Sequence, residues 1–199
     1  YPSETPTHGE GTVAPYEPKE GYVSASTPEH PYVLGADYDW AGLRSLTGKG
    51  AIMKALENGQ DDLVDNMDQL LADVGAAINS HYSVAYGTSS NEEGITGCMA
   101  KYFGFNKNAY VSFASDHTAR QWAEKLKGEL DVRPLLYFGY MKEGKIGGHA
   151  FVLDAYGQYE GADVFHVNFG WDGDCNGYYY EGNFDSDGNP DFNVSWGCG

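Results

Sequence analysis

The protein has 199 residues, and 12 Lys and Arg stand against 29 Asp and Glu, which gives a formal charge of −17 at pH 7. Nucleic acids and anionic membranes are recognised by clustered Lys and Arg, so this balance excludes a duplex nucleic-acid binder and disfavours a membrane-surface protein. Hydrophobic residues make up 41% of the chain and aromatic residues 15%, which excludes a disordered acidic tail and predicts a packed core in a single domain.

Residues 1–37 are predicted to form a Pro-rich extended segment on the surface. Six of the eight prolines lie in this segment, and its apolar residues show no helical spacing. Proline fixes φ and removes a backbone donor, so it disfavours helices and central strands. Residues 38–199 are then predicted to form the helix-plus-sheet part of a single domain.

Amphipathic helices are predicted after the Pro-rich segment. Apolar residues recur at helical spacing over about 60–75, with Gly75 as the C-cap. The same spacing predicts a helix over about 94–103 that ends at Gly104, and another over about 117–130.

After Pro134 the residue pattern changes to short runs of aromatic and β-branched residues, which are separated by glycine turns. These runs are LLYFGYM, HAFVLDAY, VFHVNFGW and GYYYEG. They are typical of consecutive antiparallel strands. Helices in the first half and an antiparallel sheet in the second half indicate an α+β fold.

The three cysteines, Cys98, Cys175 and Cys198, are too few for a disulfide framework and form no zinc-binding array. One bridge, for example between Cys175 and Cys198, stays open as an alternative.

The sequence shows neither an apolar run long enough to span a membrane nor a signal peptide. It begins with Tyr1 rather than Met, which predicts a processed or excised piece of a longer polypeptide.

Reactive side chains are densest in the strings GGHAFVLD and FHVNFGWDGDCNGYYY. His149 begins one predicted strand and Asn168 lies on the next, so two neighbouring antiparallel strands can bring them side by side. An imidazole acts as a base when an acceptor orients one of its nitrogens, and an amide oxygen can be that acceptor. The alternative is a structural histidine at a strand edge.

Three neighbours of this pair fit the same chemistry. Gly147 and Gly148 leave room for a substrate main chain to approach His149. Trp171, shortly after Asn168, is placed to shield the pair from water.

The strings GGHAFVLDAY and FHVNFGWDGxxNGYYY resemble the His and Asn segments of the streptopain family of cysteine peptidases, which have a papain-like fold. Weaker matches in the family's order include Tyr38-Asp39-Trp40, LLADVG, YGTSS and YFGF, so the resemblance covers roughly residues 38–180. It implies a papain-like α+β fold, incomplete at the N-terminus, and a cysteine endopeptidase that hydrolyses peptide bonds through an acyl-thioester.

The resemblance also implies roles for single residues. His149 is the catalytic base and Asn168 orients it. The implied substrate-binding residues are Gly148, Trp171 and Ser90, and Phe169 replaces a tryptophan of the family. The resemblance implies a bacterial proenzyme that is secreted or at the cell surface, with a polypeptide substrate and with neither a cofactor nor a metal.

The nucleophile expected by this resemblance is missing from the sequence. In papain-like peptidases the Cys lies about 130–150 residues before the His, but the segment before Cys98 holds no cysteine. Cys98 itself lies only 51 residues before His149, so we interpret it as a buried helix cysteine. The 199 residues are therefore predicted to be inactive alone, with the Cys and a propeptide on an N-terminal chain or segment.

Two readings of another class stay open. Asp172–Gly177 matches half of an EF-hand loop, but Asn183 stands where a bidentate Glu is required, and Asp185–Asp191 repeats the acidic spacing. A surface calcium site is therefore the weaker interpretation of two acidic turns, and His149 with His166 is a weaker zinc candidate still. The other reading is a non-catalytic secreted binding domain on the peptidase scaffold.

Overall fold

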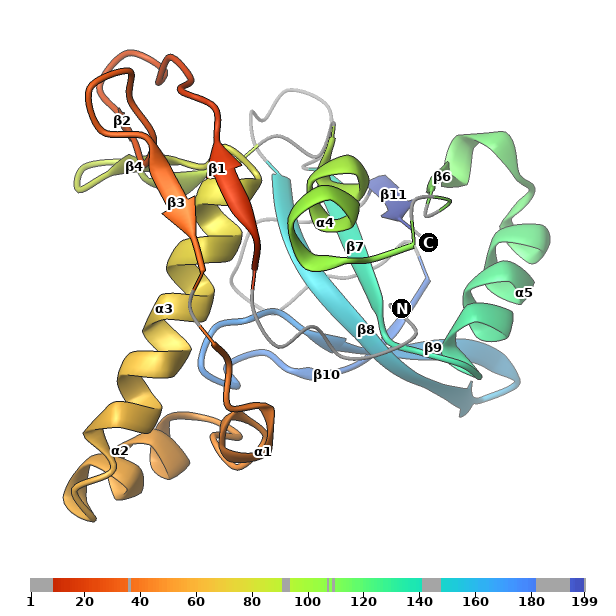
Figure 1. Ribbon diagram of the computed structural model, residues 1–199. Coiled ribbons are helices and arrows are strands. Elements are labelled where there is room, and N and C mark those ends of the chain that lie inside the picture. The colour runs from red at the N-terminus through yellow and green to blue at the C-terminus, as the bar shows by residue number, and fades with distance from the viewer. Residues whose placement is uncertain are drawn as a thin grey trace. The chain divides into compact units, whose positions relative to one another are not determined.

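The computed structural model in Figure 1 describes residues 9–35, 37–90, 94–106, 108, 110–140, 148–181 and 194–198, with backbone only for Tyr140 and 194–198. The chain divides into two compact units, Tyr1–Ala109 and Tyr110–Gly199. Each unit has its own cluster of buried apolar side chains. The single domain expected from the length stays a prediction, and the structure describes two units with a core each.

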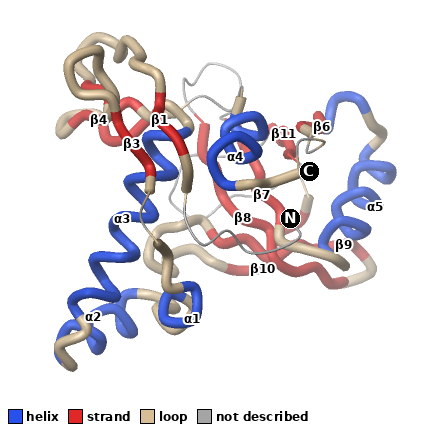
Figure 2. The backbone as a smooth tube through the Cα atoms, in the orientation of Figure 1, coloured by secondary structure: helices blue, strands red, loops and turns tan. Residues whose placement is uncertain are grey.

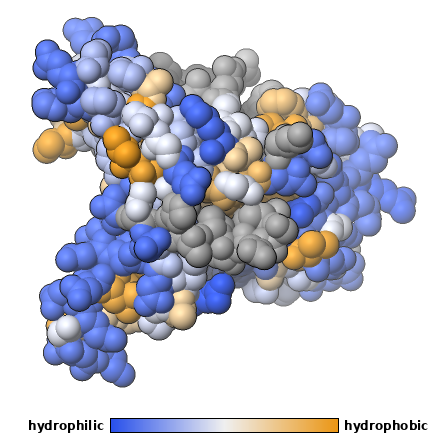
Figure 3. Space-filling view, in the orientation of Figure 1, coloured by the Kyte–Doolittle hydropathy of each residue, from blue (hydrophilic) through white to orange (hydrophobic). Residues whose placement is uncertain are grey.

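The first unit holds the helices α1 (Trp40–Leu43), α2 (Lys49–Glu57), α3 (Asp61–Ala77) and α4 (Ile95–Phe103). The helices predicted over about 60–75 and 94–103 are confirmed by α3 and α4. Hydrophilic side chains cover most of the visible surface of α3 (Figure 3), as the acidic composition leads one to expect. Among the described residues, no helix has the length and apolar character needed to cross a membrane.

The ends of these two helices contrast. Gly75 was predicted as a C-cap, but this is wrong, because α3 continues to Ala77 and its C-cap is Ile78. A side chain at position 75 would collide with the hydroxyl of Tyr82, so this glycine permits close packing rather than helix termination. Gly104 is the C-cap of α4 as predicted, with a left-handed φ of 67° that favours glycine.

Short strands complete the first unit. β1 (Gly11–Val13) pairs with β3 (Tyr32–Leu34), and β4 (His81–Ser83) lies between β2 (Val23–Ser24) and β5 (Gly87–Ser89). All of these pairs are antiparallel.

The described part of the Pro-rich segment is therefore more than a surface excursion. Val13 and Leu34 are only 2% and 4% exposed and join the core of the first unit. The buried Ser26 donates to the Val13 carbonyl (2.7 Å) and accepts from the Tyr32 amide (3.1 Å). The prolines of this segment disfavour a helix, and the buried side chains of Val13, Leu34 and Ser26 attach it to the first unit.

A buried carboxylate connects this segment to α3. Asp73 is 0% exposed and accepts hydrogen bonds from the hydroxyls of Tyr38 (2.6 Å) and Tyr32 (2.8 Å) and from the Gln69 side-chain amide (2.8 Å). A buried charge is tolerated only when it is hydrogen-bonded in this way. Burial and then the bond to Asp73 raise the pKa of Tyr32 to about 12, and the same causes raise the pKa of Tyr38.

The described part of the second unit is a sheet with one α-helix. Its elements are β6 (Val111–Phe113), the 3₁₀ turn η1 (Ala114–Asp116), α5 (Ala119–Leu130), β7 (Leu135–Tyr140), β8 (Gly148–Tyr159), β9 (Ala162–Asn168), β10 (Gly177–Tyr180) and β11 (Val194–Cys198). The described strands form a six-stranded sheet in the order β10-β9-β8-β7-β11-β6, in which every pair is antiparallel. Figure 2 shows these strands in red, with α5 beside them in blue.

The four predicted strands are confirmed by β7, β8, β9 and β10, and the third predicted helix by α5. α5 begins at a capping box in which Thr118 and Gln121 exchange hydrogen bonds. Trp122 and Leu126 of α5 pack against one face of the sheet, whose buried side chains are Leu135, Tyr137, Phe151, Leu153, Phe165, Val167 and Phe169. Helices followed by an antiparallel sheet confirm the α+β class.

Candidate active site

His149 lies at the start of β8, on the same face of the sheet as the core. β-strand side chains alternate between faces, so His149 shares its face with Phe151 and Leu153, which are 2% and 0% exposed. β8 pairs with β7 on one side, where Gly139 faces His149, and with β9 on the other. The imidazole thus continues a row of core side chains to the end of the sheet, where it is half-buried.

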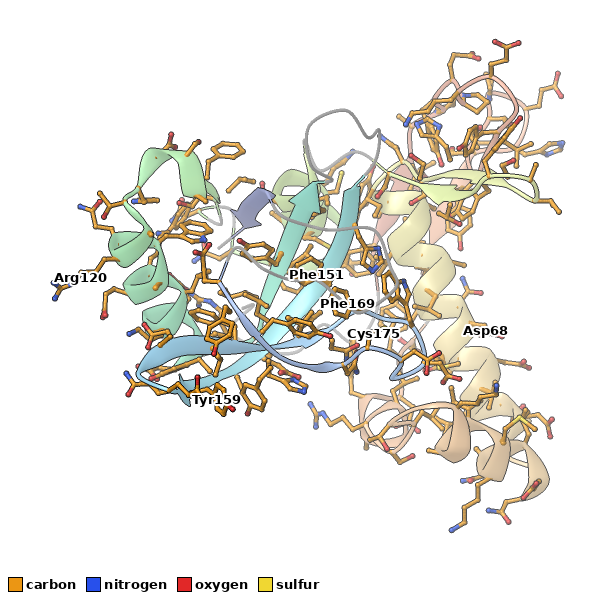
Figure 4. The ribbon with its side chains drawn as sticks, turned by 180° about the vertical axis from the view of Figure 1, so that it is seen from behind. Asp68, Arg120, Phe151, Tyr159, Phe169 and Cys175 are labelled. Carbon is orange, nitrogen blue, oxygen red and sulfur yellow. The ribbon has the colours of Figure 1, made fainter. Side chains whose placement is uncertain are left out.

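Aromatic rings surround this imidazole. Its centroid lies 4.7 Å from that of Trp171 at an interplanar angle of 30°, and 6.2 Å from those of Phe151 and Phe169. Trp171 and Phe169 also stack on each other at 5.0 Å. Figure 4 shows Phe151 and Phe169 close together where β8 and β9 run side by side. Trp171 therefore stacks on one face of the imidazole, and its role in shielding a His149–Asn168 pair from water stays a prediction.

A main-chain carbonyl orients the ring. His149 Nε2 lies 2.7 Å from the carbonyl oxygen of Phe169. A carbonyl only accepts hydrogen bonds, so Nε2 must carry the proton and donate. In the neutral ring the lone pair then resides on Nδ1, which is the nitrogen that can act as a base.

Asn168 stands next to this carbonyl but makes a local bond. Its Oδ1 accepts from the amide of Gly170 (2.9 Å), whose φ is 75°, and Asn176 Oδ1 accepts from the amide of Phe169 (3.0 Å). The two asparagines thus hold the main chain on both sides of the carbonyl that binds His149. His149 and Asn168 each have these other partners in this structure, and the orienting role of Asn168 stays a prediction.

Sequence reasoning missed the Phe169 carbonyl and Asn176. A backbone acceptor leaves no residue signature, and Phe169 suggested only an apolar lid. Asn176 lies in the string DGDCNG, where a turn-forming role explains it without any site. The sequence does not show that Asn168 and Asn176 both bind the main chain directly after the end of β9.

The remaining predicted site residues are dispersed. Gly148 is exposed and pairs with Tyr140 at the first position of β8. Ser90 is exposed in the first unit, directly after β5. Gly147 lies outside the described residues. The substrate-binding roles of Gly148, Trp171 and Ser90 stay predictions.

Cys98 has the environment of a structural thiol. It lies in α4 of the first unit, half-buried against the core of that unit. Burial raises the pKa of the Cys98 thiol, and the nearby Lys101 only partly offsets this. A catalytic cysteine requires the opposite shift, toward the thiolate. The alternative bridge between Cys175 and Cys198 involves a Cys198 side chain that lies outside the described part.

The metal alternatives gain little. Asp172 and Asp174 are exposed in the turn between β9 and β10, and the second acidic turn, Asp185–Asp191, lies outside the described residues. Within the described ranges, no three His, Cys, Asp or Glu side chains converge as metal ligands would. His166 lies on the opposite face of the sheet from His149, where its Nδ1 is 2.6 Å from Asp154 Oδ1.

Curated proteins with similar sequences are bacterial thiol proteases. Streptopain from Streptococcus pyogenes serotype M28 is 30% identical over 124 residues, which are 61% of this chain and 30% of that protein. The thiol protease/hemagglutinin PrtT from Porphyromonas gingivalis is 28% identical over 151 residues, which are 74% of this chain and 15% of that protein. The chain thus spans less than a third of the length of these relatives.

Solved structures with a similar fold come from Prevotella intermedia. Active wild-type interpain A, a cysteine protease, superposes with a TM-score of 0.71 at 24% identity, over 97% of this chain and 75% of that one. A fragment of prointerpain A gives 0.66 at 24% identity, over 98% of this chain and 57% of that one. These superpositions confirm the papain-like α+β fold.

The model of the peptidase C10 family matches residues 3–179. This match includes the His149 and Asn168 strings and the described elements of the first unit. The chain therefore belongs to the peptidase C10 family, the streptopain family that its sequence resembles.

Proposed function

We propose that this chain supplies the base of a cysteine endopeptidase. The observation that supports this most directly is the half-buried His149, with Nε2 bonded to the Phe169 carbonyl and one ring face on Trp171. This arrangement directs the proton to Nε2 and the lone pair to Nδ1. Membership in a peptidase family supplies the reaction in which such a base acts.

The reaction would proceed through an acyl-thioester. Nδ1 of His149 takes the proton of a cysteine thiol, and the thiolate attacks the scissile carbonyl carbon. When the tetrahedral intermediate collapses, the C–N bond breaks and the leaving amine takes the proton from His149. His149 then deprotonates a water, which attacks the thioester and releases the acid and the thiol.

The surroundings of His149 suit the imidazolium that forms in each step. The bond from Nε2–H to the Phe169 carbonyl becomes charge-assisted and therefore stronger. The Trp171 ring, 4.7 Å away, attracts the cation through its π face. Both interactions stabilise positive charge on the ring while it holds the proton of the thiol.

Asn168 fits the role of a positioning residue in this scheme. Its side chain binds the Gly170 amide and so restrains the turn that presents the Phe169 carbonyl to His149. Gly148, exposed beside His149, would leave room for the substrate main chain. Trp171 and Ser90 are the other substrate-binding residues that we propose.

The nucleophile, in our proposal, comes from a segment outside these 199 residues. The only cysteine before His149 is Cys98, whose burial raises its pKa. Similarity to a prointerpain A fragment supports a proenzyme with an N-terminal segment. The bacterial relatives support a bacterial protease, and we propose that it is secreted or at the cell surface.

The test begins with intact mass and N-terminal sequencing of the native protein, to identify any polypeptide that accompanies this chain. A thiol-reactive peptide probe should label a cysteine in that polypeptide rather than Cys98. In the intact protein, His149→Ala should lower kcat by about a hundredfold or more, whereas Cys98→Ser should leave it unchanged. Labelling of Cys98 alone, or full activity in His149→Ala, would overturn the proposal.

The alternative of a non-catalytic binding domain is distinguished by the same experiment. It predicts that the native protein, with all its polypeptides, neither hydrolyses peptides nor reacts with the probe. A calcium site would in addition raise the melting temperature on addition of calcium.

A further inference from the structure

A hollow of about 500 Å³ opens on the sheet of the second unit, away from the site of His149. Its lining residues come from β8, β9 and β10 and are Gly157, Gln158, Tyr159, Val164, Tyr178 and Tyr180. We call this hollow the tyrosine groove. The proposed peptidase reaction uses none of its residues.

The strand register explains why the groove exists. Gly157, Val164 and Tyr180 face one another across the three strands, and Tyr178 faces His166 in the next row. Phe165 and Val167 point into the core, so their neighbours on β9 point to the opposite face. Val164, only 7% exposed, forms the floor, and Gly157 adds no side chain that would fill the space.

The tyrosine rings of the groove are open to solvent. Tyr159 and Tyr178 are each 59% exposed, and Tyr180 is 39% exposed. The face of a tyrosine ring carries partial negative charge and therefore attracts cations. Elsewhere in the protein two lysines bind tyrosines in another way, because Lys125 and Lys101 donate to the hydroxyls of Tyr110 (2.7 Å) and Tyr102 (2.8 Å).

Carboxylates predominate around the groove, although Asp163 is paired with Lys127 (2.9 Å) and Asp154 with His166 (2.6 Å), whose ring packs on that of Tyr178. Residues 148–181, which form its three strands and their turns, contain six Asp and Glu and neither Lys nor Arg. Glu160 directly follows Tyr159, and Glu181 directly follows Tyr180. Such a surface concentrates cations and repels anions, in agreement with the overall charge of −17.

We propose that the tyrosine groove binds Arg and Lys side chains of a polypeptide. Each cationic group would lie against a tyrosine face while the surrounding carboxylates supply long-range attraction. The groove lies at the opposite end of β8 from His149, roughly 30 Å away for a strand of this length, and Figure 4 shows Tyr159 far from Phe151 and Phe169. It is therefore a separate binding site, which does not depend on the proposed catalysis.

The test measures binding of a fluorescent oligo-arginine peptide to the full chain by anisotropy. The peptide should bind more tightly than a Gly-Ser peptide of the same length, and its Kd should rise with salt. Tyr178→Ala with Tyr180→Ala should raise the Kd roughly five- to thirtyfold. The matched Phe substitutions keep the rings and should hold the Kd within about twofold of the original.

Two controls separate this site from other effects. Tyr110→Ala removes an exposed ring outside the groove, which Lys125 already contacts, and should not change the Kd. His149→Ala should also leave it unchanged, so failure of the proposed catalysis would not affect the result. Equal binding of both peptides, binding of a neutral oligosaccharide instead, or an unchanged Kd in the double Ala variant with native circular dichroism would overturn the proposal.

Discussion

The two units are stabilised by cores of different chemistry. All three fully buried polar residues among the described residues, Ser26, Asp73 and Ser80, lie in the first unit. The core of the second unit is aromatic and aliphatic, and at its margin lies the half-buried His149. Hydrogen bonds in the first core specify where distant segments dock. The rings of the second core pack around the imidazole of His149.

The largest effect is expected from the aromatic core. Phe165 is 0% exposed, and its partner on β8 is Tyr156 rather than His149, so Phe165→Ala tests packing alone. It should lower the free energy of unfolding of the second unit by about 3–5 kcal/mol. Urea unfolding with amide hydrogen exchange on β8 and β9 would measure this.

The matched control for Phe165→Ala is Leu136→Ala, because Leu136 is 39% exposed on β7. It should cost about 1 kcal/mol or less. If the exchange rates in α3 rose as much as those in β8, the two cores would be one cooperative structure and the comparison would fail.

A somewhat smaller effect is expected from the polar core. Asp73→Ala removes the acceptor shared by Tyr32, Tyr38 and Gln69, and leaves the buried hydroxyl of Tyr38 and the half-buried hydroxyl of Tyr32 without this acceptor. Each unsatisfied group costs about 1–3 kcal/mol, so the first unit should lose about 3 kcal/mol, measured by exchange in α3.

Asp68→Ala is the matched control for Asp73→Ala, since Asp68 is an exposed Asp on the same helix (Figure 4). Its effect should stay within about 0.5 kcal/mol. Equal destabilisation by the two variants would mean that the buried hydrogen bonds contribute nothing beyond the loss of one negative charge.

The same comparison explains what the sequence can predict. The regular elements of the second unit follow from local patterns, such as the alternation in HAFVLDAY, and the strings that make His149 a candidate base lie on the neighbouring strands β8 and β9. In the Asp73 network the bonded residues are separated by 35 and 41 positions in the sequence. Asp73 is one of several Asp residues in its helix, so the sequence does not indicate that it is buried or which residues bind it. The Phe169 carbonyl is invisible for a different reason, because every residue carries one.

High pH should weaken the first unit selectively. Burial and the bond to Asp73 raise the pKa of Tyr32 to about 12 in the folded chain, above the usual value of about 10. A raised folded pKa stabilises below the unfolded pKa, and this contribution is lost as the pH rises from about 10 to about 12. Exchange in α3 should therefore accelerate over this interval before that in β9. In Asp73→Ala the difference between α3 and β9 in the pH at which exchange accelerates should shrink. Simultaneous unfolding of both units of the original protein would contradict the assignment of this pH dependence to Tyr32.

The smallest effect is expected from a purely local interaction in the second unit. Thr118 caps α5 by accepting from the Gln121 amide, and the Gln121 side chain accepts from the Thr118 amide in return. Thr118→Ala should lower the free energy of unfolding by about 1 kcal/mol, whereas Arg120→Ala, on the exposed surface of the same helix (Figure 4), should change it by about 0.5 kcal/mol or less. Because Trp122 and Leu126 hold α5 on the sheet, loss of the cap should increase exchange only in the first turn of α5. Faster exchange throughout β8 would show instead that the aromatic core depends on this helix end, and that local and long-range stabilisation are coupled in the second unit.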